Sequence, residues 1–331
     1  MKNVYGIKGN IIYTKVFGKY EVVSNGIIVV ENERVKGVYN ELPEKYKNID
    51  IKDYGDKLII PGFIDLHLHA PQFPNMGLGL DKELMPWLNK YTFPEEAKYD
   101  DLQYAESVYK KLIKKIWSVG TTRCCIFNTI HKESTKLLLD LFNKSGLGAY
   151  IGKVNMDREC PDILIEDTNK SISETMEFIK EYKDKYKLVK PIITPRFVPT
   201  CSFELLKNLG EIAVGLASDI SGGHTVSIPE VITSSAQVSN IRWLNSNKVE
   251  EKLTTAELFY LATKGGGKFF GKVGSFEEDY EFDALIIDDS DLIIENNLSI
   301  EERLQKFLYI GNSNNIIERY VSGNLINEPI F

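Results

Sequence analysis

Two histidines separated by one residue, His67 and His69, end an apolar stretch that begins at Ile60. In a β-strand alternate side chains point to the same face, so both imidazoles are expected on one side of the chain. Two imidazoles on one face can bind a single metal ion. Hydrogen-bonded structural histidines would give the same pattern, so a metal site needs further ligands from elsewhere in the sequence.

Polar residues end two other apolar segments. Arg196 lies near the end of residues 191–197, and Asp219 ends residues 214–219, just before a serine–glycine turn. A carboxylate at such a strand end can bind a metal ion or act as a base on water. Asp219 could equally cap the turn that follows it, and this alternative stays open at the level of the sequence.

The middle of the chain, residues 58–273, alternates β-type and amphipathic segments. Strands are predicted up to His69 and at residues 122–127, 149–154, 191–197 and 214–219. Helices are predicted at residues 100–118, 132–143, from Ser171 onward, 202–213, 229–244 and 254–270. Ser171 and Glu174 are expected to form a capping box at the start of the third helix. The alternation predicts parallel strands with crossover helices, an α/β fold of the (β/α) TIM barrel type with its active site at the carboxyl ends of the strands.

Both ends of the chain have a different character. Residues 1–57 and 274–331 consist of short β-branched segments bounded by turns, such as 10–14, 26–31, 282–288 and 317–324. They predict one composite β-sandwich domain built from both termini, beside a barrel domain at residues 58–273.

Composition excludes several classes of function. The net charge of −7 gives no electrostatic footprint for nucleic acid or for an anionic membrane. No apolar run approaches the roughly 18 residues that span a bilayer, and the four cysteines show no disulfide or zinc-knuckle spacing. We therefore expect a cytoplasmic protein with reduced thiols.

Five segments together resemble the guanine deaminase family of the amidohydrolase superfamily. They are residues 61–72 (PGFIDLHLHAPQ), 87–95 (WLNKYTFPE), 194–197 (TPRF), 218–223 (SDISGG) and 305–311 (QKFLYIG). The resemblance implies a homodimeric hydrolase of purine catabolism that converts guanine to xanthine and ammonia with a bound zinc ion. Imidazole and carboxylate ligands would also suit iron.

The resemblance also implies roles for individual residues. His67, His69 and Asp219 would bind the metal, and Asp219 would be the catalytic proton acceptor. Gln72 and Arg196 would hydrogen-bond the purine edge, and Phe197 would pack beside the ring. The implied substrate-binding set is His69, Ala70, Pro71, Gln72, Arg196, Phe197 and Asp219.

One part of the family pattern is missing. The family has a further strand with a histidine followed by a glutamate, and another strand with one more histidine, which complete the metal site and supply the proton-shuttling acid. The two remaining histidines here are His131, at the start of a predicted helix, and His224, in the loop after Asp219. Only 16 residues separate Phe197 from Val214. The resemblance therefore implies that three βα units, roughly 90 residues, are absent between Ala213 and Val214, so that five of eight barrel strands remain.

Such a deletion predicts impaired catalysis, because the surviving ligands lack the neighbours that complete the metal site. It also leaves strand edges unpaired, which favours association with another chain. Three alternatives remain open: a non-catalytic remnant that binds purine weakly or pairs with a full-length homologue, an active enzyme that recruits His224 or a partner subunit's residues, and an artefact in the coding sequence.

Overall fold

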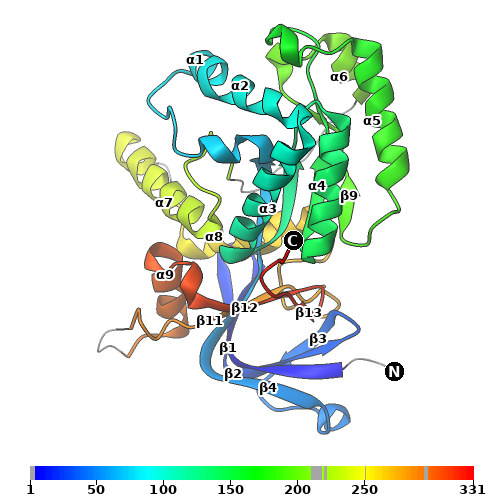
Figure 1. Ribbon diagram of the computed structural model, residues 1–331. Coiled ribbons are helices and arrows are strands. Elements are labelled where there is room, and N and C mark those ends of the chain that lie inside the picture. Colours follow the sequence, from blue (N-terminus) through cyan, green and yellow to red (C-terminus); the bar gives the residue numbers. More distant parts are fainter. Residues whose placement is uncertain (1–3, 210–217, 220–221, 250, 294–296) are drawn as a thin grey trace. The chain divides into compact units, whose positions relative to one another are not determined.

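The computed structural model describes residues 4–209, 218–219, 222–249, 251–293 and 297–331 (Figure 1). The predicted junction between Ala213 and Val214 lies outside these residues, as does most of the strand predicted at 214–219. The chain divides into two compact units. The first comprises Met1–Asp65, Ser118–Arg123 and Ser227–Asn327, and the second comprises Leu66–Trp117, Cys124–Val226 and Glu328–Phe331.

The first unit contains a seven-stranded sheet in the order β13-β12-β11-β4-β1-β2-β3. Its strands are β1 (Val4–Val16), β2 (Lys19–Glu31), β3 (Arg34–Tyr39), β4 (Asp50–Pro61), β11 (Ala284–Ile287), β12 (Ile316–Val321) and β13 (Asn324–Leu325). β4 runs parallel to β1 and antiparallel to β11, so strands from both ends of the chain lie side by side (Figure 1). Alternating residues on one face, including Ile7, Ile11, Ile59 and Ile286, are fully buried in one apolar cluster.

In the described part of this unit, the sheet is accompanied by three α-helices: α7 (Ile228–Asn245), α8 (Thr255–Tyr260) and α9 (Ile300–Ile310). The predicted helix at 254–270 is shorter than expected, because α8 continues into a π-helical turn at Leu261–Gly265 and a 3-10 turn at Lys268–Phe270. α9 begins with a capping box between Ser299 and Glu302 that the sequence analysis did not identify.

A buried ion pair lies within the first unit. Arg123 donates from Nε and Nη2 to the two carboxylate oxygens of Asp283, at 2.7 and 2.9 Å, and from Nη2 to Glu281 at 2.9 Å. The Arg123 side chain is 4% exposed and that of Asp283 is fully buried. Each charge is therefore compensated only by its partners, with little help from water.

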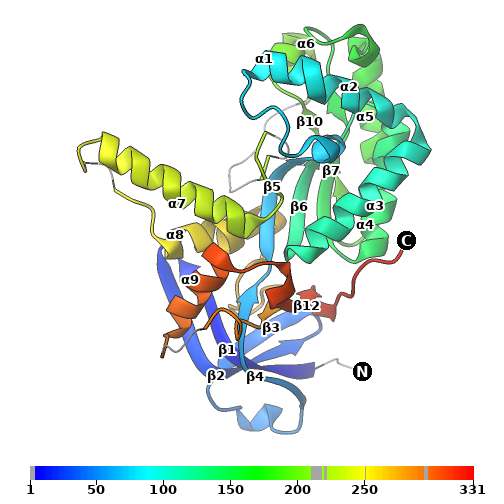
Figure 2. The same cartoon turned by 60° about the vertical axis from the view of Figure 1, so that its left-hand side comes forward.

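The second unit is built on a sheet in the order β5-β6-β7-β9, whose first two strands begin in the first unit. The strands are β5 (Phe63–His69), β6 (Thr121–Phe127), β7 (Gly148–Gly152) and β9 (Val189–Pro191), and the helices between them are α3 (Leu102–Ser118), α4 (Lys132–Ser145) and α5 (Thr168–Tyr182). Figure 2 shows α3 and α4 along one face of this sheet. The predicted α/β alternation of strands and helices is confirmed.

Two predicted strands are each split in two. Residues 149–154 form β7 and a separate short strand, β8 (Val154–Asn155), and residues 191–197 contain the end of β9 and then β10 (Thr194–Pro195). β8 and β10 pair with each other in parallel, forming a two-stranded sheet of their own. The chain continues from β10 through Arg196 to α6 (Phe203–Leu209).

The predicted capping box at Ser171 is wrong. Helix α5 begins one turn earlier, because the Asp167 side chain accepts a hydrogen bond from the amide of Lys170. The Ser171 hydroxyl instead donates to Glu166 at 3.0 Å and accepts from Asn155 at 2.8 Å. Ser171 is fully buried in this polar network rather than at a helix end.

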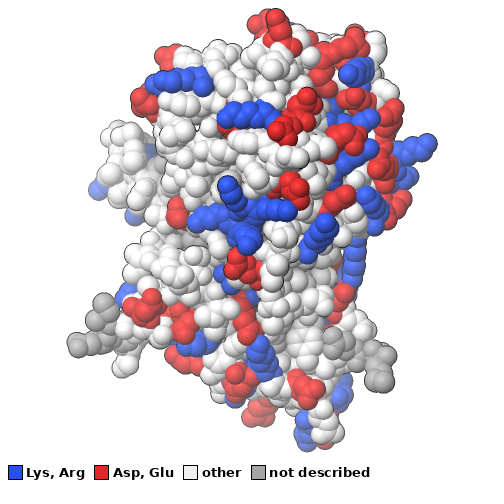
Figure 3. Space-filling view, viewed as in Figure 1, with Lys and Arg blue, Asp and Glu red and all other residues white. Residues whose placement is uncertain are grey.

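Charged side chains of both signs are intermixed on the face shown in Figure 3. Within the described part of the chain, no helix is both long and apolar enough to cross a membrane.

Candidate functional site

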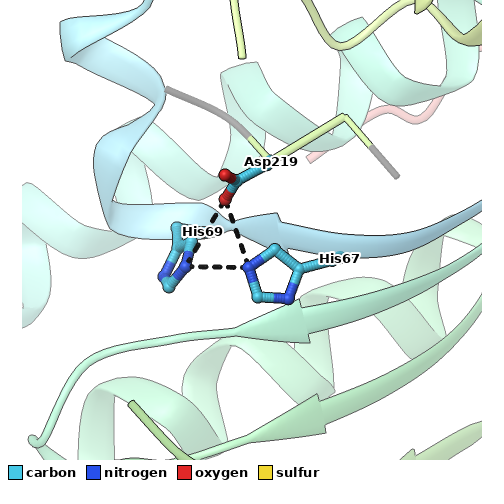
Figure 4. A group of neighbouring side chains, drawn as sticks. All are labelled: His67, His69 and Asp219. Atoms are coloured by element: carbon cyan, nitrogen blue, oxygen red, sulfur yellow. Dashed lines mark hydrogen bonds and ion pairs between the residues drawn. The ribbon is translucent and has the colours of Figure 1, made fainter. Parts of the chain in front are cut away.

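His67 and His69 lie on β5, at one edge of the four-stranded sheet. As the strand alternation predicts, their rings point the same way, and their Nε2 atoms are 3.2 Å apart (Figure 4). Phe127, the last residue of β6, packs against both rings, with centroid distances of 4.4 Å to His67 and 5.2 Å to His69. The aromatic contact restricts the orientations available to both imidazoles.

Asp219 lies beside the two histidines, although it comes from a distant part of the second unit's sequence. Its backbone amide donates to the carbonyl oxygen of His67 at 2.8 Å. Its Oδ1 atom lies 3.2 Å from Nε2 of His67 and 3.8 Å from Nε2 of His69 (Figure 4). The side chain therefore faces the histidines. The backbone of Asp219 has a φ of 45°, in the left-handed region, which aspartate tolerates better than most residues.

The three side chains fit a metal ion. One ligand atom from each lies within 4.8 Å of the other two, and no other such group was found in the described ranges. Two nitrogens bound tetrahedrally to one zinc ion at about 2.0–2.1 Å are separated by a little over 3 Å, as the two Nε2 atoms are here. Burial, with help from the charges of Arg196 and His67, lowers the pKa of His69 well below its usual value, which favours the neutral ring that binds metal.

The remaining histidines do not join this group. His131 precedes α4, but its side chain makes no cap to that helix and instead places Nδ1 3.4 Å from Asp100. His224 lies in the loop after Asp219, as the sequence indicates, yet it does not belong to the cluster.

A cavity of about 290 Å³ opens beside the three residues. Its lining consists of His67, His69, Gln72, Leu84, Trp87, Leu88, Arg196, Phe197, Asp219 and Gly222. The structure thus brings together the predicted metal ligands and three of the predicted purine-contacting side chains. Ala70 and Pro71 are buried in the 3-10 turn Ala70–Asn75 and do not belong to this lining.

Sequence reasoning missed Glu96, a buried acid behind the cavity wall. It ends α2 (Phe93–Glu96), which follows α1 (Leu84–Trp87) and a π-helical turn at Leu88–Thr92. Its Oε1 accepts from Nε2 of Gln72 at 3.0 Å, and its Oε2 accepts a short hydrogen bond from Nη1 of Arg196. Neither member of the ion pair is more than 3% exposed. The signal in the sequence was the family-like segment at residues 87–95, which ends one residue before Glu96.

Comparison with known proteins places the chain among hydrolases. The amidohydrolase family model matches residues 58–214 and 206–326. A guanine deaminase of Dictyostelium discoideum is 32% identical over 438 residues, covering 96% of this chain and 97% of the relative. The human guanine deaminase is 31% identical, with 85% of this chain and 86% of the relative covered.

A solved structure is closer in sequence than either of these relatives. The crystal structure of a guanine deaminase from C. acetobutylicum, with guanine bound in its active site, is 40% identical to this chain. The match covers 98% of this chain and 100% of the other, with a TM-score of 0.95.

Proposed function

Because this chain belongs to the amidohydrolase family, and within it to the guanine deaminases, we propose that it binds guanine in the 290 Å³ cavity and hydrolyses it to xanthine and ammonia. One observation carries this proposal. The three residues that could bind a metal ion line the same cavity as the side chains of Gln72, Arg196 and Phe197. The relative of known structure with bound guanine, at 40% identity, supports the choice of substrate.

Different residues of the chain would bind the purine and accept the proton. Arg196, as a donor, and Gln72, as an amide, suit the carbonyl and ring N–H groups of a 6-oxopurine, and Phe197 offers an apolar wall to the flat ring. Asp219 accepts a proton from the attacking water through its carboxylate. We include Ala70 and Pro71 in the substrate-binding set on the family resemblance alone; both are buried in the turn that follows β5.

We propose zinc as the metal, with iron as a second possibility that the same ligands allow. His67, His69 and Asp219 would hold the ion, which would supply Lewis-acid activation of water. Among the residues that the structure describes, none gives buried Nδ1 of His69 a hydrogen-bond partner. Ligating histidines usually gain affinity from such a partner, so we expect a weaker site than a fully supported one.

We further propose that about three βα units are absent between Ala213 and Val214, and that catalysis is slow for this reason. The alignment to the Dictyostelium protein extends over 438 residues although this chain has 331, so the relative contains positions that this chain lacks. The two segments matched by the family model meet within residues 206–214, which include the inferred junction. The chain's four histidines leave no counterpart for the family's missing ligands, and the barrel would be incomplete.

We also propose that the protein is a homodimer and that it is located in the cytoplasm. Unpaired edges of an incomplete barrel favour a homodimer, in keeping with the family resemblance. The four cysteines are thiols in the structure, three of them buried, which suits the reducing conditions of the cytoplasm.

The test is formation of xanthine and ammonia from guanine by the purified chain, with and without added zinc, beside the His67→Ala variant. We expect slow, zinc-dependent turnover that the variant lacks. Equal product in all samples would overturn the proposed function. Turnover within the usual enzyme range of about 1–1000 per second would instead overturn the proposed impairment.

A further inference from the structure

Resting on the proposed function, we propose that Glu96 is a positioning residue that sets the selectivity of the cavity for 6-oxopurines. It does so by holding Gln72 and Arg196 in fixed orientations, without itself lining the cavity. Glu96 lies on α2, Gln72 on the turn after β5, and Arg196 after β10, so one carboxylate connects three separate elements.

Each oxygen of Glu96 serves a different partner. Oε1 accepts from the Gln72 amide and Oε2 from the Arg196 guanidinium. A carboxylate is an acceptor only, so the Gln72 amide must turn its nitrogen toward Glu96. The amide orientation at the cavity wall is therefore fixed by a residue behind it.

Arg196 is fixed in the same way and from two further directions. Its backbone amide donates to the carbonyl of Asn155 at 3.3 Å, and its guanidinium lies over the Phe93 ring, 5.3 Å from the centroid. Because Nη1 donates to Glu96, the plane of the guanidinium is fixed, and its remaining N–H groups are donors toward the cavity. A purine carbonyl accepts from such a donor, whereas the amino group of an aminopurine at the same place would meet it donor to donor.

Glu96→Gln is the sharpest variant, because it preserves volume and removes one acceptor. An amide has one oxygen and one NH₂ group, so it either leaves Arg196 facing another donor or makes the Gln72 amide turn its oxygen inward, which reverses the group that Gln72 presents to the cavity. The neighbouring Glu95→Gln is a matched control. Glu95 is also buried, but it accepts from Lys98 and from Tyr104, neither of which lines the cavity.

The experiment measures the dissociation constants of hypoxanthine and adenine by calorimetry on the zinc-supplemented full chain. Hypoxanthine keeps the 6-oxo group and lacks the 2-amino group, so it cannot be deaminated. We expect the wild type to prefer hypoxanthine, and Glu96→Gln to weaken hypoxanthine about tenfold or more, the usual effect of losing one charge-assisted hydrogen bond. Adenine binding should change less, so the preference falls, while Glu95→Gln keeps it.

A purely structural role for Glu96 would weaken both ligands in proportion, and that result, or no change in either, would overturn the inference. Glu96→Asp keeps the charge of the buried pair but is too short to reach both partners, so it should lose selectivity even if Glu96→Gln does not fold. A wild-type chain that binds neither purine would overturn the proposed function, and this inference with it.

Discussion

The backbone amide of Asp219 donates to the carbonyl oxygen of His67 at 2.8 Å, and the side chains of the same two residues approach to 3.2 Å. The main chain of Asp219 is thus attached to β5 at the place where its carboxylate faces both histidines. A hydrogen bond between backbones does not depend on the metal. We therefore expect the three ligands to be assembled before an ion binds, which makes the site testable by simple removal of single side chains.

Zinc should stabilise the wild-type chain and fail to stabilise His69→Ala. An ion that binds only the folded state adds about 2.7 kcal/mol at a hundredfold excess over its dissociation constant. The measurement is the thermal unfolding midpoint with and without added zinc. His131→Ala is the control, because His131 lies beside Asp100 and outside the cluster. A zinc-induced shift that persists in His69→Ala would place the ion elsewhere.

His224→Ala should retain the zinc of the wild type. His224 is near Asp219 in sequence but does not belong to the group that His67, His69 and Asp219 form. The measurement is the metal content of both purified proteins by elemental analysis. If the variant lost stoichiometric zinc, His224 would be a recruited ligand.

Arg123→Met should destabilise the first unit by about 3–5 kcal/mol, because it leaves the carboxylate of Asp283 buried without its cation. Arg34→Met provides the comparison. Arg34 faces Asp279 at 3.7 Å with both side chains more than two-fifths exposed, so its loss should cost no more than about 1 kcal/mol. Urea unfolding of the two variants and the wild type measures both values. Similar midpoints for the two variants would contradict the expectation.

Alkylation of Cys160 should keep accelerating up to high pH. Burial raises the pKa of this half-buried thiol to about 11, although the nearby charge of Arg196 opposes the shift. Only the thiolate reacts, so below the pKa the rate should rise about tenfold per pH unit and still be rising at about pH 10, where an ordinary thiol of pKa about 8.5 has levelled off. Iodoacetamide labelling followed by mass spectrometry measures the rate, with Cys160→Ser as the background. A plateau near pH 9 would contradict this pKa.

Local pattern was sufficient for several features of the site. The alternation of β5 alone places His67 and His69 on one face, and residues at strand ends were expected to converge in an α/β fold. Gln72, Arg196 and Phe197 were identified by resemblance, and the structure places them around one cavity. Their roles in binding purine remain predictions, as do those of the metal ligands.

Glu96 could not be found in this way. Its burial depends on a π-helical turn that no residue pattern predicts. It also depends on the ion pair with Arg196, which lies 100 residues further along the chain. Phe127 was predicted as part of a strand, but its contact with the histidine rings depends on the register between β6 and β5. The capping box at Ser171 failed for a similar reason, because distant Asn155 uses the hydroxyl that the local pattern assigned to the helix end.

The left-handed backbone of Asp219 limits which substitutions can report on its chemistry. Asparagine and aspartate occupy this conformation readily, whereas alanine or glutamate would add a conformational cost to any chemical effect. Asp219→Asn is consequently the variant that isolates the carboxylate from the chain geometry. The same constraint makes glutamate a poor replacement for Asp219. We therefore expect that only a few residue types are tolerated at this position.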